Sequence, residues 1–295
     1  MDIAGLEDRY EGGMRALERC LLCPRACGVN RREGQTGFCG AGMLPRVAAV
    51  SVHHGEEPPI TGSRGSGTVF FSHCNMRCIF CQNYPISQLG IGEMLSTEEL
   101  GERLLWLERK GAHNVNFVTP TPHVPQLIGA VLAARKKGFA LPVVYNSNGF
   151  DSLYALELLE GVVDIFLPDV KTVSPRLAEE VSSTPAYPGH NAAAVSEMVR
   201  QVGALSVGED EIARRGVLIR HLVLPGKVHE TEKVLGALRK THGTQIPLSL
   251  MSQYFPAHRA ASFPGYERRL SREEYEHSVE TALRLGFENV FLQEI

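Results

Sequence analysis

Cysteine is missing from most of this chain of 295 residues, because all seven cysteines lie at or before Cys81. A disulfide scaffold would distribute its cysteines along a short secreted chain, so this distribution argues against one. The seven fall into a group of four and a group of three, which leaves none over. Two tight groups favour metal or cluster sites in a reducing compartment.

Features that would indicate particular partners are also scarce. The net charge is −3 and no dense block of Lys and Arg occurs, so nothing points to nucleic acid. No uninterrupted apolar stretch is long enough to cross a membrane, and the acidic first residues lack the apolar core of a signal peptide. No GxGxxG follows an apolar run, and no Walker A motif is present. We therefore expect a cytoplasmic protein that binds neither nucleic acid nor membrane.

The most informative motif is the CxxxCxxC run of Cys74, Cys78 and Cys81, with Phe80 before its last cysteine. Three thiolates can hold three irons of a [4Fe–4S] cluster and leave the fourth iron open to another ligand. An open iron suits catalysis, whereas electron storage normally uses a fourth cysteine. Half of a zinc site and buried small side chains are the alternatives, but zinc usually takes two CxxC-like pairs. His73 beside the motif is expected to be packed or to face solvent, with tuning of the cluster as the alternative.

A second group of cysteines lies upstream and consists of Cys20, Cys23, Cys27 and Cys39. Four sulfur ligands suit either a closed [4Fe–4S] cluster or a structural zinc. Iron–sulfur is preferred, because the spacing of the first three is uneven for zinc and Cys-Pro runs accompany clusters. Either metal would tie down a segment with little apolar material. The neighbouring Arg25 and Arg31 are expected on the surface.

Short apolar runs alternate with amphipathic helices after residue 67. The runs predicted as strands are Thr68–Ser72, Val115–Val118, Pro142–Tyr145, Val163–Leu167, Val217–Leu224, Pro247–Met251 and Asn289–Leu292. Helices are predicted between them, with capping boxes at Ser96 and Ser271, and the Gly- and Pro-rich residues 55–67 are predicted as a loop. Repeated strand–helix units need right-handed crossovers and a parallel sheet. We predict an α/β fold: a partial or near-complete TIM-like (β/α) barrel over residues 51–295, with a small N-terminal Cys-rich metal-binding module over residues 1–50.

Polar residues follow the predicted strands, at the ends where β/α barrels carry their chemistry. The cysteine triplet follows the first strand directly. The candidates after the later strands are Thr119, Thr121, Asn146, Ser147, Asn148, Asp169, Lys171 and Gln253. Strands end in polar loops in any case, so any one of these residues alone could be a solvated cap.

The cysteine triplet resembles the signature of the radical S-adenosylmethionine (SAM) superfamily, whose open iron binds SAM. With the strand–helix repeat, the runs 146–150 and 169–171 and the N-terminal CxxCPxxC…C, the chain is similar to the pyruvate formate-lyase activating enzymes. It is most similar to the uncharacterised iron–sulfur proteins described as homologues of that activase, over roughly residues 15–295. The resemblance implies an oxidoreductase or activase-like enzyme that cleaves SAM reductively to methionine and a 5′-deoxyadenosyl radical, which abstracts hydrogen from a substrate.

The resemblance also implies roles for the polar residues. Phe80 would touch the adenine of SAM. Its carboxylate and ribose region would be lined, partly through a bound monovalent cation, by Asn146, Ser147, Asp169 and Lys171. Two departures stand out: Asn146 replaces an acid of the activases, and Thr119-Pro120-Thr121-Pro122 replaces the Gly-Gly-Glu-Pro motif that holds the SAM amino group. The run 55–58, Gly-Glu-Glu-Pro, looks like the missing motif but precedes the first predicted strand. It is therefore interpreted as unrelated, with an acid at the rim of the site as the alternative.

Partners follow from the resemblance in the same way. A reduced flavodoxin or ferredoxin would be the electron donor. The substrate would be a glycine in a partner enzyme, another protein or a small molecule, and the missing Gly-Gly-Glu-Pro motif weakens the case for glycyl-radical activation. Two alternatives belong to other classes: a non-catalytic iron–sulfur electron-transfer protein, and a scaffold that binds two zinc ions.

Overall fold

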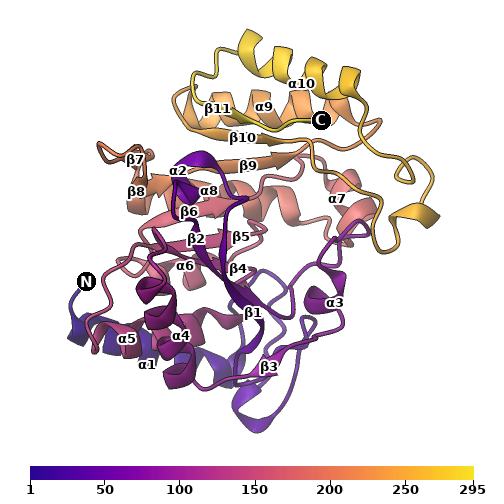
Figure 1. The fold of residues 1–295 in the computed structure, drawn as a ribbon. Helices are drawn as coiled ribbons and strands as arrows, with labels where there is room; N and C mark the ends of the chain where they lie inside the picture. Colours follow the sequence, from indigo (N-terminus) through magenta and orange to yellow (C-terminus); the bar gives the residue numbers. More distant parts are fainter.

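A curved sheet of parallel strands, joined by helices, forms the body of the molecule (Figure 1). The structure is a computed structural model and describes every residue from Met1 to Ile295. The parallel strands are β2 (Ser66–Phe71), β4 (Val115–Val118), β5 (Val143–Ser147), β6 (Ile165–Pro168), β8 (Ala213–Val217), β9 (Ile219–Leu222), β10 (Leu248–Met251) and β11 (Val290–Leu292). Each predicted apolar run overlaps a strand, and the run 217–224 contains the end of β8 and all of β9.

The sheet consists of two parallel sets that meet where β8 runs into β9. In the first set β2, β4, β5, β6 and β8 are neighbours in that order, and in the second β9, β10 and β11 are. The pairing of β8 with β6 continues along β9 through a bridge between Asp169 and Arg220. The strands therefore curve from β2 to β11, and β11 pairs only with β10. This is the partial barrel that the strand–helix alternation predicts.

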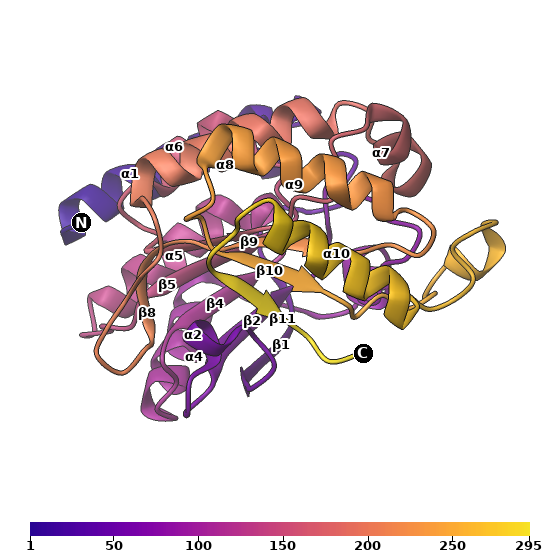
Figure 2. The same ribbon diagram turned by 90° about the horizontal axis from the view of Figure 1, so that it is seen from above.

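Helices cover the outer side of the strands, and α1, α6, α8 and α9 lie along it in Figure 2. The longer helices are α1 (Ile3–Ala16), α4 (Thr97–Arg109), α5 (Val124–Arg135), α6 (Leu153–Leu159), α7 (Pro175–Ser182), α8 (Tyr187–Val202), α9 (Val228–His242) and α10 (Arg272–Arg284). The predicted capping boxes at Ser96 and Ser271 begin α4 and α10. In α4, Leu100, Leu104 and Leu107 recur at helical spacing and are fully buried. None of the helices has the length and apolar character of a membrane span.

The N-terminal residues are joined to the barrel by a helix and a strand. Helix α1 packs on α5, where a Cβ at Gly13 would lie 3.1 Å from Pro125 Cβ, so a side chain there would require the two helices to move slightly apart. Strand β1 (Arg46–His53) pairs antiparallel with β2 and with the short β3 (Glu93–Met94), and a further short strand, β7 (Ser206–Val207), pairs with β8. The predicted boundary at residue 50 falls inside β1, and the division into two parts stays a prediction.

A short segment predicted as part of a loop fills the interior of the barrel. It forms helix α2 (Pro58–Thr61), which lies among the strands in Figure 1. Ile60 of α2 is fully buried against inward-facing side chains of β5 and β6, among them Val144 and Leu167. Side chains fill the interior of a small barrel as a packed core, so α2 takes the place of a layer that strands would otherwise supply.

Candidate active site

A cavity of about 480 Å³ lies at the C-terminal ends of the strands, and the cysteine triplet forms part of its wall. Cys74, Cys78 and Cys81 come from the loop after β2, which leads into the short helix α3 (Tyr84–Ser87). Every predicted cofactor-binding residue except Thr121 lines the same cavity, namely Phe80, Thr119, Asn146, Ser147, Asn148, Asp169, Lys171 and Gln253. The strand-end pattern therefore brings together the residues that it singles out.

Thr121 does not reach the cavity because its hydroxyl is turned toward the buried Asp151. Oδ1 of Asp151 accepts hydrogen bonds from Thr121 Oγ1 and Tyr145 OH, each at 2.7 Å, and Oδ2 accepts one from Ser147 Oγ at 2.7 Å. Burial raises the pKa of Asp151, and the three donors oppose that rise. The network ties the loop after β4 to β5, so Thr121 acts on the site through its neighbours.

The triplet sulfurs lie in a buried environment with hydrogen-bond donors. Cys74 Sγ accepts from the backbone N–H of Met76 at 3.4 Å and from Asn148 Nδ2 at 3.3 Å. Burial raises the pKa of the Cys74 thiol to about 12 and that of Cys78 to about 11. Metal ligation requires such thiols to lose their protons, and N–H···S bonds are a usual feature around cluster sulfurs.

The donor set therefore fits a cluster held by three thiolates. No group of three or more His, Cys, Asp or Glu side chains is arranged as the ligand shell of a single metal ion. The fit consequently rests on three sulfurs in one cavity, those of Cys74 and Cys78 being buried, which leave one corner of a four-iron cluster without a protein ligand.

A buried ion pair lies beside Cys78. Lys171 Nζ donates to Asp169 Oδ2 at 2.6 Å, and both side chains are largely buried. Burial lowers the pKa of Lys171, but the charges of Asp169 and Cys78 outweigh it, so that pKa lies above its usual range. Tyr187 OH accepts from the Lys171 backbone N–H at 3.1 Å and donates to the Asp169 carbonyl at 2.9 Å, which fixes the loop. The cavity thus offers one fixed positive and one fixed negative group.

Arg220 and Glu56 also line the cavity, and the strand-end pattern does not indicate them. Arg220 Nε and Nη2 donate to the Glu57 carboxylate at 2.8 and 2.6 Å, and Nη2 also contacts the Glu56 carboxylate. Burial raises the pKa of Glu57, but Arg220 outweighs it, so the pKa lies below its usual range. Of the two interpretations of the Gly-Glu-Glu-Pro run, an acid at the rim is therefore the one that the structure supports. The sequence feature that could have indicated Arg220 is its position as a charged residue inside the apolar run 217–224.

The N-terminal cysteines line a second, small cavity together with Asn75, and these cysteines are Cys20, Cys23, Cys27 and Cys39. Backbone hydrogen bonds from Cys20 N to Val29 O and from Gly28 N to Cys20 O, both 3.0 Å, fold the segment into a tight loop. Burial raises the pKa of the Cys23 thiol to about 12. The expected surface position of Arg31 is wrong: this side chain is only 1% exposed, because it donates to the carbonyls of Gly42 and Pro122.

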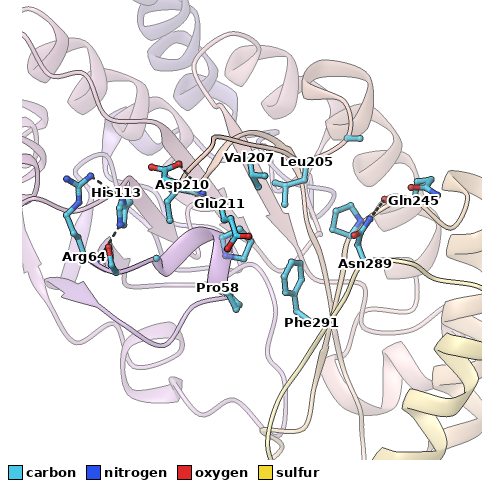
Figure 3. Close-up of a pocket in the computed structure, with 16 residues that line it drawn as sticks. Pro58, Arg64, His113, Leu205, Val207, Asp210, Glu211, Gln245, Asn289 and Phe291 are labelled. Atoms are coloured by element: carbon cyan, nitrogen blue, oxygen red, sulfur yellow. Dashed lines mark hydrogen bonds between the residues drawn. The ribbon is translucent and has the colours of Figure 1, made fainter.

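A larger cavity, of about 980 Å³, lies at the opposite ends of the strands (Figure 3). Its lining includes His113 before β4 and Gln245 and Asn289 before β10 and β11. It contains no cysteine, and Arg64 occupies part of it by contacting His113. Barrels place their chemistry at the C-terminal ends of the strands, so the smaller cavity with the cysteines is the candidate active site despite its volume.

Comparison with known sequences gives one family match and two relatives. The model of the family described as the radical SAM superfamily matches residues 68–238, which include the cysteine triplet. The chain is 29% identical over 296 residues to the uncharacterized protein MJ0674 of Methanocaldococcus jannaschii, covering 97% of this chain and 80% of that protein. It is 26% identical over 170 residues to the uncharacterized protein MJ0808 of the same organism, covering 52% of this chain and 49% of that protein.

Several solved structures share the fold. Methylornithine synthase (PylB) has a TM-score of 0.51 at 14% identity and covers 99% of this chain and 71% of its own. Native anSMEcpe with bound AdoMet has a TM-score of 0.52 at 11% identity, with coverages of 80% and 62%. SuiB of Streptococcus suis bound to precursor peptide SuiA has a TM-score of 0.51 at 10% identity, with coverages of 75% and 46%. The chain spans about half the length of SuiB, and identities this low show a common fold alone.

Proposed function

The chain belongs to the radical SAM superfamily, and we propose on that premise that it cleaves SAM reductively at a [4Fe–4S] cluster held by Cys74, Cys78 and Cys81. The observation that carries the proposal is that these three thiols share one cavity with the polar ends of the neighbouring strands. When bound, the cluster and SAM supply an electron and a 5′-deoxyadenosyl radical that abstracts hydrogen from a substrate.

The residues of the cavity have separate tasks in this proposal. Asn148 and the Met76 backbone hold the Cys74 sulfur in place through their N–H groups. Lys171 faces the carboxylate of SAM, while Asp169 accepts from its ammonium or ribose hydroxyls. Phe80, buried at the cavity wall, offers its ring to the adenine. The same walls exclude water from a reactive radical.

Polar groups at the end of β4 and β5 complete the cofactor pocket in this proposal. Thr119, Asn146, Ser147 and Gln253 line the cavity, and the Ser147 hydroxyl donates to Asp151. Thr119 has a left-handed backbone with φ of 58°, an uncommon conformation that a non-glycine residue adopts mostly where its surroundings hold it there. We propose that Thr119 takes the place of the acid that the activases use for the SAM amino group.

We propose that the substrate is a protein, peptide or small molecule that binds beside Arg220 and Glu56. Arg220, which bridges to Asp169 on the neighbouring strand, and its partner Glu56 both line the cavity, so this ion pair offers charge to a substrate group beside SAM. The fold shared with SuiB, which was solved with its precursor peptide, supports a peptide among these possibilities. A reduced flavodoxin or ferredoxin is the proposed electron donor.

The experiment is SAM cleavage by the anaerobically reconstituted protein under dithionite. Wild-type protein is expected to form 5′-deoxyadenosine, and Cys78→Ala is expected to form none, because two thiolates do not hold the site-differentiated cluster. Leu89→Ala is the matched control, since Leu89 lies close to the motif in sequence but is 66% exposed. Retained 5′-deoxyadenosine formation in Cys78→Ala would reject the ligand assignment. A reduced cluster whose electron paramagnetic resonance spectrum does not change when SAM is added would favour the non-catalytic electron-transfer protein instead. A protein that contains zinc and no iron would favour the zinc-binding scaffold.

A further inference from the structure

The two cysteine groups meet at the tripeptide His73-Cys74-Asn75. On one side of Cys74, Asn75 lines the small N-terminal cavity together with Cys23. On the other side, the His73 ring packs against Gly40, the residue after Cys39. A ligand of the proposed SAM cluster is therefore flanked by two residues that each contact the N-terminal group.

Asn75 lies between the two groups and is held there by hydrogen bonds. Its side chain is fully buried, and its Oδ1 accepts from Asn148 Nδ2 at 2.7 Å, while Nδ2 donates to the Phe150 carbonyl at 2.6 Å. The same Asn148 Nδ2 is 3.3 Å from Cys74 Sγ. Asn75 thus borders the cavity of the N-terminal group and is linked through Asn148 to Cys74.

His73 needs a special backbone to reach the N-terminal group. Its φ is 72°, and two glycines make room for its ring. A Cβ at Gly40 would lie 3.2 Å from His73 Nδ1, and one at Gly90 would lie 2.8 Å from its Cε1. Such a left-handed, closely packed histidine is held by its surroundings, so the contact between the two groups is built into the fold.

Arg25 places a positive charge between the two groups. Its Nε donates to the Asn75 carbonyl at 3.1 Å, and its guanidinium lies 3.8 Å above the Phe38 ring. Arg25 lines the N-terminal cavity and donates to the residue after Cys74, so this one guanidinium lies next to both groups. The net charge around a cluster sets its reduction potential, and a shared cation favours an added electron on either side.

The two groups differ in their access to solvent. Cys27 of the N-terminal group is exposed, whereas the Cys74 and Cys78 sulfurs are buried. Arg77, which is exposed, stacks on Phe38 next to this group and adds positive charge at the surface. A protein electron donor can therefore approach the N-terminal group more closely than the buried triplet, and a donor with an acidic surface is favoured there.

We propose that Cys20, Cys23, Cys27 and Cys39 hold a second [4Fe–4S] cluster that relays electrons to the SAM cluster past Asn75, which lines the cavity of these cysteines and hydrogen-bonds Asn148 beside Cys74. The inference rests on the proposed function. A reduced flavodoxin loses one electron, and the relay cluster passes from the 2+ to the 1+ state. It returns to 2+ as the SAM cluster is reduced from 2+ to 1+. No bond forms or breaks and no proton moves in this transfer.

The first test follows electron flow in the full-length, anaerobically reconstituted wild-type protein. After mixing with a limiting amount of reduced flavodoxin, freeze-quenched electron paramagnetic resonance is expected to show the relay signal before the SAM-responsive signal. When dithionite reduces both clusters, the magnetic interaction between their two spins is expected to split the lines of the electron paramagnetic resonance spectrum. Zinc at the N-terminal cysteines, unsplit signals, or a SAM-responsive signal that appears first would each overturn the relay.

The second test uses variants with matched controls. In Cys20→Ala/Cys23→Ala, reduction of the SAM cluster by flavodoxin is expected to slow by an order of magnitude, while dithionite, which is small, still supports 5′-deoxyadenosine formation. An unchanged flavodoxin rate would overturn the relay alone, whereas wild-type protein without 5′-deoxyadenosine under dithionite would overturn the proposed function. Arg25→Gln is expected to lower the reduction potentials of both clusters. The control is Arg32→Gln, since Arg32 is exposed and pairs with Glu18, and it is expected to leave both reduction potentials unchanged. If Arg25→Gln shifted the potential of one cluster only, Arg25 would not lie between the two clusters as proposed.

Discussion

Replacing Arg220 with methionine tests the ion pair at the centre of the barrel. The side chains of Arg220, Glu56 and Glu57 are 14%, 7% and 5% exposed, so both carboxylates would lose their partner in a largely buried place. Breaking a buried pair on one side costs about 3–5 kcal/mol. An unfolding entropy of about 0.6 kcal/mol/K for a chain of this size converts that cost into a Tm lower by about 5–8 °C.

The loss should depend on pH in a defined direction. Because Arg220 holds the pKa of Glu57 below its usual range, the pair stabilises the fold above the unfolded pKa of Glu and loses this effect as pH falls through the lower folded pKa. The difference in Tm between wild type and Arg220→Met is therefore largest near neutral pH and shrinks in acid. The assay is thermal unfolding by circular dichroism on anaerobically reconstituted protein at several pH values.

A matched control separates this effect from the loss of any arginine. Arg214 pairs with Asp210 on the surface, with side chains 49% and 48% exposed, so Arg214→Met should cost less than about 1 kcal/mol. Glu57→Gln combined with Arg220→Met should recover part of the loss, because one unpaired carboxylate is removed. If Arg220→Met unfolds at the same temperature as Arg214→Met, the buried pair does not carry the stability assigned to it.

Two further predictions concern buried polar groups. Thr121→Val removes one of three donors to the buried Asp151 carboxylate and should lower the free energy of unfolding by about 1–3 kcal/mol, with the affinity for SAM unchanged. Chemical denaturation measures the first quantity and SAM binding the second. A specific loss of SAM affinity would instead place the Thr121 hydroxyl at the cofactor. Burial lowers the pKa of His221 to about 4, so between pH 6.5 and 4 the unfolded chain binds more protons and stability should fall as pH falls, by about 2 kcal/mol at pH 5. His221→Gln should flatten that part of the pH profile, and an identical profile in both proteins would show that His221 is not the group responsible.

Much of the fold was predictable, because the signals for strands are local. Strands buried on both faces read as continuous apolar runs, and β4 has the predicted bounds Val115–Val118. The positions of the polar residues at the strand ends followed from the topology, since parallel strands bring their C-terminal ends to one face. Capping boxes at Ser96 and Ser271 depend only on residues three positions apart and were also predictable.

The parts that could not be predicted depend on contacts between distant segments. Arg220 and Glu57 are 163 positions apart, and their pairing requires α2 to enter the barrel, which its Pro-rich sequence does not indicate. Thr121 lies near the site as predicted, but its rotamer is decided by Asp151. Arg31 looks like a surface residue until the carbonyls of Gly42 and Pro122 that accept its donors are known. Each case is a polar group whose partner lies far along the chain.

The measurement that tests the central claim most directly is electron–nuclear double resonance on the reduced protein with SAM labelled with ¹⁵N at its amino group. We predict a clear ¹⁵N hyperfine coupling to the cluster, because the iron that Cys74, Cys78 and Cys81 leave without a protein ligand binds that group. A reduced cluster with no ¹⁵N coupling, and with the same spectrum in the presence and absence of SAM, would contradict the account.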